Sequence, residues 1–397
     1  MHWNFVFLVV GRACHQSGFV LFIVALMHVI YIETASALFM SFIPVTITLA
    51  RFGANLIAPL LFARFYLTTI LIFATRTKVL LLVLVFACIF YDLLFLAYII
   101  VFFVSMMDAW FDPSSQALVP RIVDKEKRVR ANSTISLVSE GVEFICWALG
   151  GLLLAYVHAP FLFLLVVLNA VFTAASCTFL HQRVNKTFAN DGEPKSWHTE
   201  MRRGFSVMVS SRWLLHAVLA SFLTSFASVV WIAAITYLFV EQVLMVSEGW
   251  WGFLNASLLI GLLLASLVLR THHSLIQQNQ SKTVFVGLVG TALFTILFAL
   301  TVEPFIALLI IACLGFFLQL EAVASQTLYQ ERIDVNVLPY VYAAEGTVAM
   351  FGFALGSLLV GFAADHLHLM FIYLISALLI VLASFLWFRA FKQEWQK

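Results

Sequence analysis

The fold of this chain is decided by Ser115-Gln116-Ala117-Leu118, by Ile122-Val123-Asp124 shortly after it, and by Ala148-Leu149-Gly150-Gly151-Leu152-Leu153. The same series returns in the same order in the second half, as Ser325-Gln326-Thr327-Leu328, Arg332-Ile333-Asp334 and Ala354-Leu355-Gly356-Ser357-Leu358-Leu359. The offset is 210 at the first serine and 206 at the first glycine, so the two copies have drifted but kept their order. A repeat of half the chain, running in the same direction, predicts two similar structural halves.

The composition places the chain in a membrane. It is 63% hydrophobic and only 11% charged, whereas soluble domains are about 45–50% apolar and about 25% charged. Apolar runs, each long enough to cross about 30 Å of hydrocarbon, cover residues 4–30, 36–62, 65–89, 93–113, 132–156, 160–180, 213–240, 249–270, 283–301, 304–328, 341–364 and 368–390. We therefore predict an all-α membrane protein of twelve transmembrane helices, arranged as two six-helix bundles related by pseudo-symmetry.

The basic residues predict the orientation of these helices. Of the 22 Lys and Arg, four lie within the predicted spans, and all the others fall in the loops of one side and in the C-terminal segment. Since loops rich in Lys and Arg stay in the cytoplasm, both termini are expected to be cytoplasmic.

One polar segment separates the two halves. Residues 181–211 contain the turn-forming Asn190-Asp191-Gly192-Glu193-Pro194, followed by Trp197, Met201, Phe205 and Met208 at helical spacing. This pattern predicts an amphipathic helix on the inner leaflet. We expect an N-terminal bundle over 1–180, a cytoplasmic linker over 181–211 and a C-terminal bundle over 212–397.

This organisation resembles the major facilitator superfamily. The run from Phe111 to Pro120, the pair Ala131-Asn132 and the run Gln326-Thr327-Leu328-Tyr329-Gln330 are similar to bacterial macrolide-efflux-like exporters. The spacing from Ala131-Asn132 to Glu140 is also similar to bacterial lysophospholipid transporters. The resemblance implies alternating access around a central site and a bacterial inner membrane. One departure is the loop Pro59–Tyr66, which keeps Arg64 but lacks the Gly and Asp usual in that superfamily.

Ionisable residues within the spans are candidates for function, because each costs about 3 kcal/mol or more if unpaired at the bilayer centre. On the first span, Arg12, His15, Gln16 and Phe19 share one helix face, and on the fifth, Glu140, Glu143 and Trp147 do the same. We expect proton coupling from Glu140, Glu143 and Asp108. We expect the substrate cavity to be lined by Arg12, His15, Gln16, Phe19, Trp147 and Trp231.

The remaining charges are interpreted as gating groups. Candidates are Arg51, Arg64, Arg76, Lys78, Glu321, Arg332 and Glu345. Arg12, Arg51, Arg76 and Glu140 lie at similar depth, which favours pairing among them, and Glu321 and Glu345 could pair with Arg332 or with an arginine of the linker. The alternative for the whole set is a static charge network that closes the cytoplasmic side. The glycines Gly150, Gly151, Gly352 and Gly356 are expected to let helices approach closely.

No cofactor is expected. The five cysteines show no CxxC spacing, which argues against a metal site, and no phosphate-binding loop indicates use of ATP. No enzyme activity and no nucleic-acid partner are expected. The prediction is a monomeric, proton-coupled antiporter that exports small amphiphilic or lipophilic molecules among membrane lipids. The alternatives are a transporter of lysophospholipid or a lipid precursor, and a membrane sensor that transports nothing.

Overall fold

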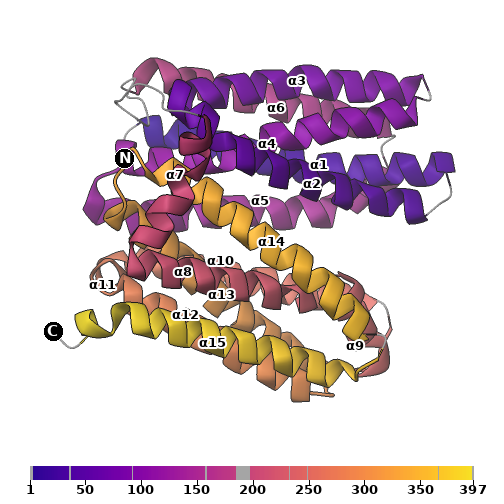
Figure 1. Cartoon of the computed structure of the whole chain (residues 1–397). Helices are drawn as coiled ribbons and strands as arrows, with labels where there is room; N and C mark the ends of the chain where they lie inside the picture. Colours follow the sequence, from indigo (N-terminus) through magenta and orange to yellow (C-terminus); the bar gives the residue numbers. More distant parts are fainter. Residues whose placement is uncertain are drawn as a thin grey trace. The chain divides into compact units, whose positions relative to one another are not determined.

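Helices account for every regular element in the part of the chain that the structure describes. The computed structural model describes residues 3–34, 37–91, 93–156, 159–184, 197–231, 233–247, 249–364 and 366–395. The prediction of an all-helical membrane fold is confirmed (Figure 1). Helices suit a membrane because they satisfy their backbone hydrogen-bonding groups within the segment, where no water is present to do so.

The first half contributes six long helices and one short 3₁₀ turn. They are α1 (Trp3–Thr34), α2 (Ala37–Arg64), α3 (Leu67–Phe90), α4 (Leu94–Ile122), η1 (Lys125–Lys127), α5 (Arg128–Tyr156) and α6 (Ala159–Arg183).

The second half follows the same plan with additional short elements. They are α7 (Trp197–Ser210), α8 (Arg212–Ala227), η2 (Ser228–Trp231), α9 (Ala233–Gln242), α10 (Gly249–Thr271), α11 (His273–Gln278), α12 (Gln280–Leu300), α13 (Pro304–Arg332), α14 (Leu338–Ala364) and α15 (Leu369–Trp395).

Eleven helical stretches among the described residues are long and apolar enough to cross a membrane. The twelfth is α5, with 29 residues, which carries two arginines and two glutamates and is therefore less apolar. The seventh predicted span, 213–240, is interrupted: it consists of α8, the 3₁₀ turn η2 and α9.

The predicted end of the fourth span, at residue 113, is wrong. Helix α4 continues through Pro113 and the following serines to Ile122. Ser114 and Ser115 are completely buried, so their polarity is accommodated by surrounding protein and does not end the helix.

The polar segment between the halves agrees with the predicted helix. Helix α7 covers Trp197–Ser210, and Met208 of its predicted apolar stripe is buried. Residues 185–196, which include the turn-forming Asn190–Pro194, lie outside the described residues.

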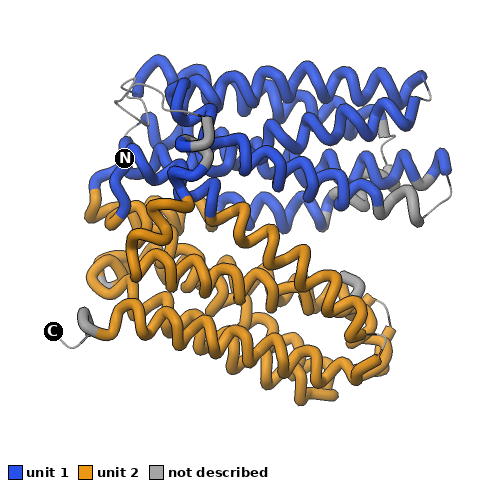
Figure 2. The backbone as a smooth tube through the Cα atoms, viewed as in Figure 1, with its two compact units in different colours: residues 1–124, 138–204, 333–344 blue, residues 125–137, 205–332, 345–397 orange. Residues whose placement is uncertain are grey.

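The chain divides into two compact units, coloured in Figure 2. Unit 1 comprises Met1–Asp124, Val138–Gly204 and Ile333–Ala344, and unit 2 comprises Lys125–Leu137, Phe205–Arg332 and Glu345–Lys397. In unit 1, α1 packs on α6, α3 packs on both α4 and α6, and α2 packs on α4. In unit 2, the repeat-related helices pack in the same way: α8 on α15, α12 on both α13 and α15, and α10 on α13. The packing therefore repeats with the sequence.

Each unit contains a segment from the other half of the chain. The start of α5, Lys125–Leu137, belongs to unit 2, and the start of α14 with its preceding turn, Ile333–Ala344, belongs to unit 1. The first segment begins directly after Asp124 and the second contains Asp334, and these two aspartates occupy the same place in the two repeat copies. The exchange is thus reciprocal.

Specific contacts hold both exchanged segments. In unit 2, the buried Asn132 donates hydrogen bonds of 2.8 Å from Nδ2 to Thr327 Oγ1 and to Gln330 Oε1. In unit 1, Nη2 of Arg121 donates to the carbonyl of Val335 at 3.2 Å, and the Tyr340 ring lies edge-on to Phe62.

Two glycines of α14 bring this helix close to α8 within unit 2. A Cβ at Gly352 would lie 2.8 Å from the carbonyl oxygen of Phe222, and one at Gly356 would lie 2.7 Å from that of Phe226. The packing role expected for these glycines is confirmed, because no larger residue fits without a shift of backbone.

Candidate functional site

One face of α1 contacts two other helices of unit 1, α4 and α5. Nη1 of Arg12 donates a hydrogen bond of 2.7 Å to Ser115 Oγ on α4. Nε2 of Gln16 donates one of 2.7 Å to Glu143 Oε2 on α5. The residues that the sequence placed on one helix face therefore do point toward neighbouring helices.

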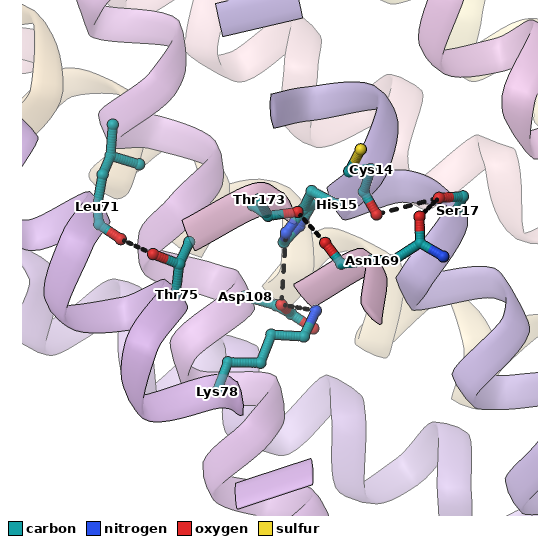
Figure 3. A network of polar contacts seen from close by, with 9 residues as sticks. All are labelled: Cys14, His15, Ser17, Leu71, Thr75, Lys78, Asp108, Asn169 and Thr173. Atoms are coloured by element: carbon teal, nitrogen blue, oxygen red, sulfur yellow. Dashed lines mark hydrogen bonds and ion pairs between the residues drawn. The ribbon is translucent and has the colours of Figure 1, made fainter. Parts of the chain in front are cut away.

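The most deeply buried charges of unit 1 lie on α3 and α4, next to the same face of α1. Nζ of Lys78 lies 2.6 Å from Oδ1 of Asp108, and Nδ1 of His15 lies 3.7 Å from the same oxygen. The three residues are 5%, 1% and 6% exposed, respectively. Figure 3 shows the lysine and the histidine approaching one carboxylate from different helices.

Packing fixes the histidine in this position. The imidazole of His15 stacks on the ring of Phe111, with centroids 4.0 Å apart and an angle of 15° between the planes. Because the ring cannot rotate away without losing this stack, His15 is held beside Asp108.

Hydroxyl and amide groups surround this charge cluster (Figure 3). Thr173 Oγ1 donates to the carbonyl of Asn169, and Ser17 Oγ donates to Asn169 Oδ1 at 2.7 Å. A cavity of about 10 Å³ is lined by His15, Lys78 and threonines of α3 and α6. Asn169 and Thr173 are not among the predicted site residues; an amide in the middle of the sixth apolar run is the sequence signal that points to the first of them.

The acids of α5 are less buried than Asp108. Glu140 and Glu143 are both partly exposed, and Glu143 is engaged by Gln16. Trp147, one turn further along the helix, is 46% exposed. Proton coupling by Glu140 and Glu143, and a place for Trp147 in the substrate cavity, stay predictions.

The candidate gating cations of unit 1 occupy different surroundings. Cζ of Arg51 lies 4.6 Å from the centroid of the Phe19 ring. Arg64 and Arg76 are exposed, and Nη2 of Arg76 lies 3.4 Å from Thr178 Oγ1. Of the four cations within the predicted spans, only Lys78 forms an ion pair with an acid among the described residues.

Two candidate acids lie near each other in unit 2. The carboxyl of Glu345, on α14, has the side chains of Tyr329 and Ser221 as hydrogen-bonding neighbours, and it lies within electrostatic reach of Glu321 on α13. The guanidinium of Arg332 lies over the ring of Phe391, 4.9 Å from its centroid.

The predicted cavity residue Trp231 lies in the core of unit 2. It ends the 3₁₀ turn η2 and packs against Phe298 and Tyr373, at centroid distances of 5.1 and 5.2 Å. Beside the same turn is an apolar cavity of about 230 Å³, bounded by α8, η2, α14 and α15. Its Ser376 donates a hydrogen bond of 2.8 Å to the carbonyl of Ala227, at the end of α8.

No group of three or more His, Cys, Asp or Glu is placed to hold a metal ion within the described part of the chain.

Membrane-crossing helices in two repeat-related units, with charges buried between the helices, define a transmembrane transporter. The chain belongs to the Major Facilitator Superfamily, whose family model matches residues 8–344. Two similar proteins come from Bacillus subtilis (strain 168). The uncharacterized MFS-type transporter YfmI is 23% identical over 92% of this chain and 91% of its own length. The uncharacterized MFS-type transporter YjbB is 30% identical over 62% of this chain and 60% of its own length.

Solved structures of transporters share the fold. A bacterial homologue of the iron transporter ferroportin, in an outward-facing state, has a TM-score of 0.79 at 13% identity and covers 98% of this chain and 99% of its own. The transporter FucP, in the outward conformation, has a TM-score of 0.78 at 12% identity and covers 98% of each chain. At these identities the likeness concerns the fold alone.

Proposed function

We propose that this protein is a proton-coupled antiporter that exports amphiphilic or lipophilic small molecules by alternating access. It would act as a monomer in a bacterial inner membrane. The observation that carries the proposal is the buried pair of Lys78 and Asp108, with His15 at 3.7 Å from the shared carboxylate oxygen.

A proton at Asp108 would change the forces between helices. The ionised carboxylate holds Lys78 of α3 at 2.6 Å. Protonation removes the negative charge, and Lys78 is then a buried cation without its counterion. Breaking a buried pair by removing one partner costs about 3–5 kcal/mol. This approaches the roughly 5.5 kcal/mol that moves a two-state equilibrium from 1:99 to 99:1, so one proton can bias the choice between two conformations.

His15 is suited to deliver or receive that proton. Its Nδ1 lies 3.7 Å from a carboxylate oxygen of Asp108, so the imidazole is placed to pass a proton to that oxygen or to take one from it. Transfer of a proton from the imidazolium to Asp108 would leave neutral histidine and a neutral carboxyl, with Lys78 still charged.

Apolar and aromatic surfaces support an amphiphilic or lipophilic substrate. Phe19 lies on the same face of α1 as His15, and unit 2 contains an apolar cavity of about 230 Å³. The direction of transport is proposed from the likeness of the Phe111–Pro120 run to macrolide-efflux-like exporters.

The test is transport by the full chain in proteoliposomes with an imposed pH gradient and a panel of lipophilic and amphiphilic dyes. We expect Asp108→Asn to abolish uphill movement driven by the gradient while leaving exchange without a gradient. The exposed acid Glu303, changed to Gln, is the matched control. Gradient-driven transport that survives Asp108→Asn would remove this residue from the coupling mechanism.

A second candidate function is transport of a lysophospholipid or lipid precursor. The observation in its favour is the rim of the unit 2 cavity, where Leu359 and Ile375 are 52% and 49% exposed. In a membrane protein, exposed apolar side chains on transmembrane helices face hydrocarbon, so a lipid chain could enter sideways. Movement of fluorescent lysolipid in the same proteoliposomes, without movement of dyes, would favour this function over drug export.

A further inference from the structure

We infer that Arg51 binds an anionic group of the transported molecule, so that the substrate is an amphiphile with a carboxylate or phosphate head. This inference rests on the proposed transport function and adds the sign of the substrate's charge. It begins with a guanidinium that lies inside a transmembrane helix and lacks an ionic partner in the described part of the chain.

The surroundings of Arg51 leave part of its hydrogen-bonding capacity unused. Its Cζ lies over the ring of Phe19 at 4.6 Å. Its Nε is buried and has no hydrogen-bond partner. An aromatic face attracts a cation, but it accepts no hydrogen bond in the plane of the guanidinium, where an oxyanion binds.

The other cations of this part of unit 1 are already engaged. Lys78 is paired with Asp108 at 2.6 Å. Arg12 donates to Ser115 and lies within electrostatic reach of Asp112. For Arg51, no ion pair with an acid occurs among the described residues, so its positive charge is available for a ligand.

The charge of an arginine inside a membrane is permanent, because the guanidinium stays protonated in proteins. A permanent positive charge in a low-dielectric region therefore favours an anion as its counterion.

The geometry also selects the form of the ligand. The free edge of a guanidinium donates two parallel hydrogen bonds to a carboxylate or phosphate. Phe19 lies directly beneath it and offers an apolar surface for the first carbons of an attached chain. A head group with a negative charge and an alkyl tail fits both features.

The test is isothermal titration of the purified full chain in a neutral maltoside detergent, without any pH gradient. The probes are decanoate, decyl phosphate, decanol, decyltrimethylammonium and inorganic phosphate. We expect both anionic amphiphiles to bind about tenfold or more tightly than decanol, as a charged hydrogen bond provides. Decyltrimethylammonium should bind no better than decanol, and inorganic phosphate much more weakly than decyl phosphate.

Variants locate the preference. Arg51→Gln should bring the affinity for decanoate and decyl phosphate to that for decanol, whereas Arg51→Lys should keep part of the difference, since lysine retains the charge but not the paired donors. Arg389→Gln is the matched control, because Arg389 also lies over a phenylalanine, Phe385, at 5.4 Å. Unchanged affinity for decanol verifies that each variant is folded.

Two outcomes would overturn the inference: equal affinity for decanol and the anions in the unaltered protein, or an anion preference that survives Arg51→Gln. A lysophosphatidate probe distinguishes the source of the phosphate, since tighter binding than decyl phosphate identifies a lipid and weaker binding a soluble amphiphile. Glu303→Gln, the control of the transport assay, should keep the anion preference. Because binding is measured without a pH gradient, a failure at Arg51 is separable from a loss of proton coupling.

Discussion

Lys78 and Asp108 meet through one oxygen, Oδ1, and this oxygen is also the one that faces Nδ1 of His15. A single carboxylate therefore joins α3 to α4 and has α1 as its third neighbour. All three side chains are buried, so the ion pair has little water to replace a lost partner. Removing one charge of the pair should therefore change the free energy of unfolding as well as transport.

We expect Lys78→Met to lower the free energy of unfolding by about 3–5 kcal/mol, because Asp108 is then a buried charge without a partner. The double variant Lys78→Met and Asp108→Asn should recover most of this loss, since no unpaired charge is left. Unfolding by denaturant in detergent, followed by circular dichroism, measures both.

The exposed Lys282, changed to Met, controls for removal of a cation from a helix. A double variant as unstable as Lys78→Met alone would indicate that Lys78 stabilises the protein by packing and not through Asp108.

Asn132 offers a second test, on the segment of α5 that belongs to unit 2. Its amide donates to both Thr327 and Gln330 at 2.8 Å, and all three side chains are buried. Asn132→Ala should reduce stability by about 1–3 kcal/mol, because two buried acceptors lose a donor. Asn255→Ala is the control, because the partly exposed Asn255 donates its hydrogen bond to the carbonyl of Trp251 in its own helix. Equal melting temperatures for the two variants would contradict the role of Asn132.

A pair of glycines on one helix separates close packing from helix propensity. In Gly356→Ala the new methyl would lie 2.7 Å from the carbonyl oxygen of Phe226, whereas at Gly361 it would meet nothing within 4 Å. We expect Gly356→Ala to cost about 1–3 kcal/mol through overpacking. Gly361→Ala should be neutral or slightly stabilising, because alanine is the better helix former. Thermal melting of both variants in detergent measures the difference. Similar melting temperatures would argue against a tight contact of α14 with α8.

Glu140 is the acid on α5 for which the sequence predicts proton coupling. It lies in the part of α5 that belongs to unit 1. Asp108, on α4, belongs to the same unit. We expect Glu140→Gln to abolish efflux of an amphiphilic dye driven by a pH gradient, because the amide cannot carry the proton. Efflux at the level of the unaltered protein would assign coupling to Asp108 without Glu140. Parallel measurement of dye exchange without a gradient controls for folding.

The sequence predicts most of the fold because hydropathy and the repeat report on whole helices. The same helix pairs occur in both units, as a half-chain repeat requires. Interruptions are harder to foresee: α8 ends at Ala227, although apolar residues continue. Tyr373 and Ser376, far away in the sequence, supply hydroxyls to the carbonyls at this break, and no local pattern contains that information.

The partners of the buried charges could not be predicted from depth alone. Equal depth favoured pairing among Arg12, Arg51, Arg76 and Glu140, whereas Arg51 lies on Phe19 and Arg76 lies near Thr178. Depth follows from counting residues along a helix, but pairing also depends on how each helix is rotated about its axis. Lys78 and Asp108 are 30 residues apart on adjacent helices, and packing of α3 on α4 sets the rotation that brings them together.

The reciprocal exchange of Lys125–Leu137 and Ile333–Ala344 has a consequence for biosynthesis. Chains are made from the N-terminus, and domains generally fold as they emerge. Unit 1 cannot be completed at that stage, because Tyr340, which packs on Phe62, has not yet been translated. The two halves of the gene product must therefore mature together, and neither half expressed alone would contain all the residues of a finished unit.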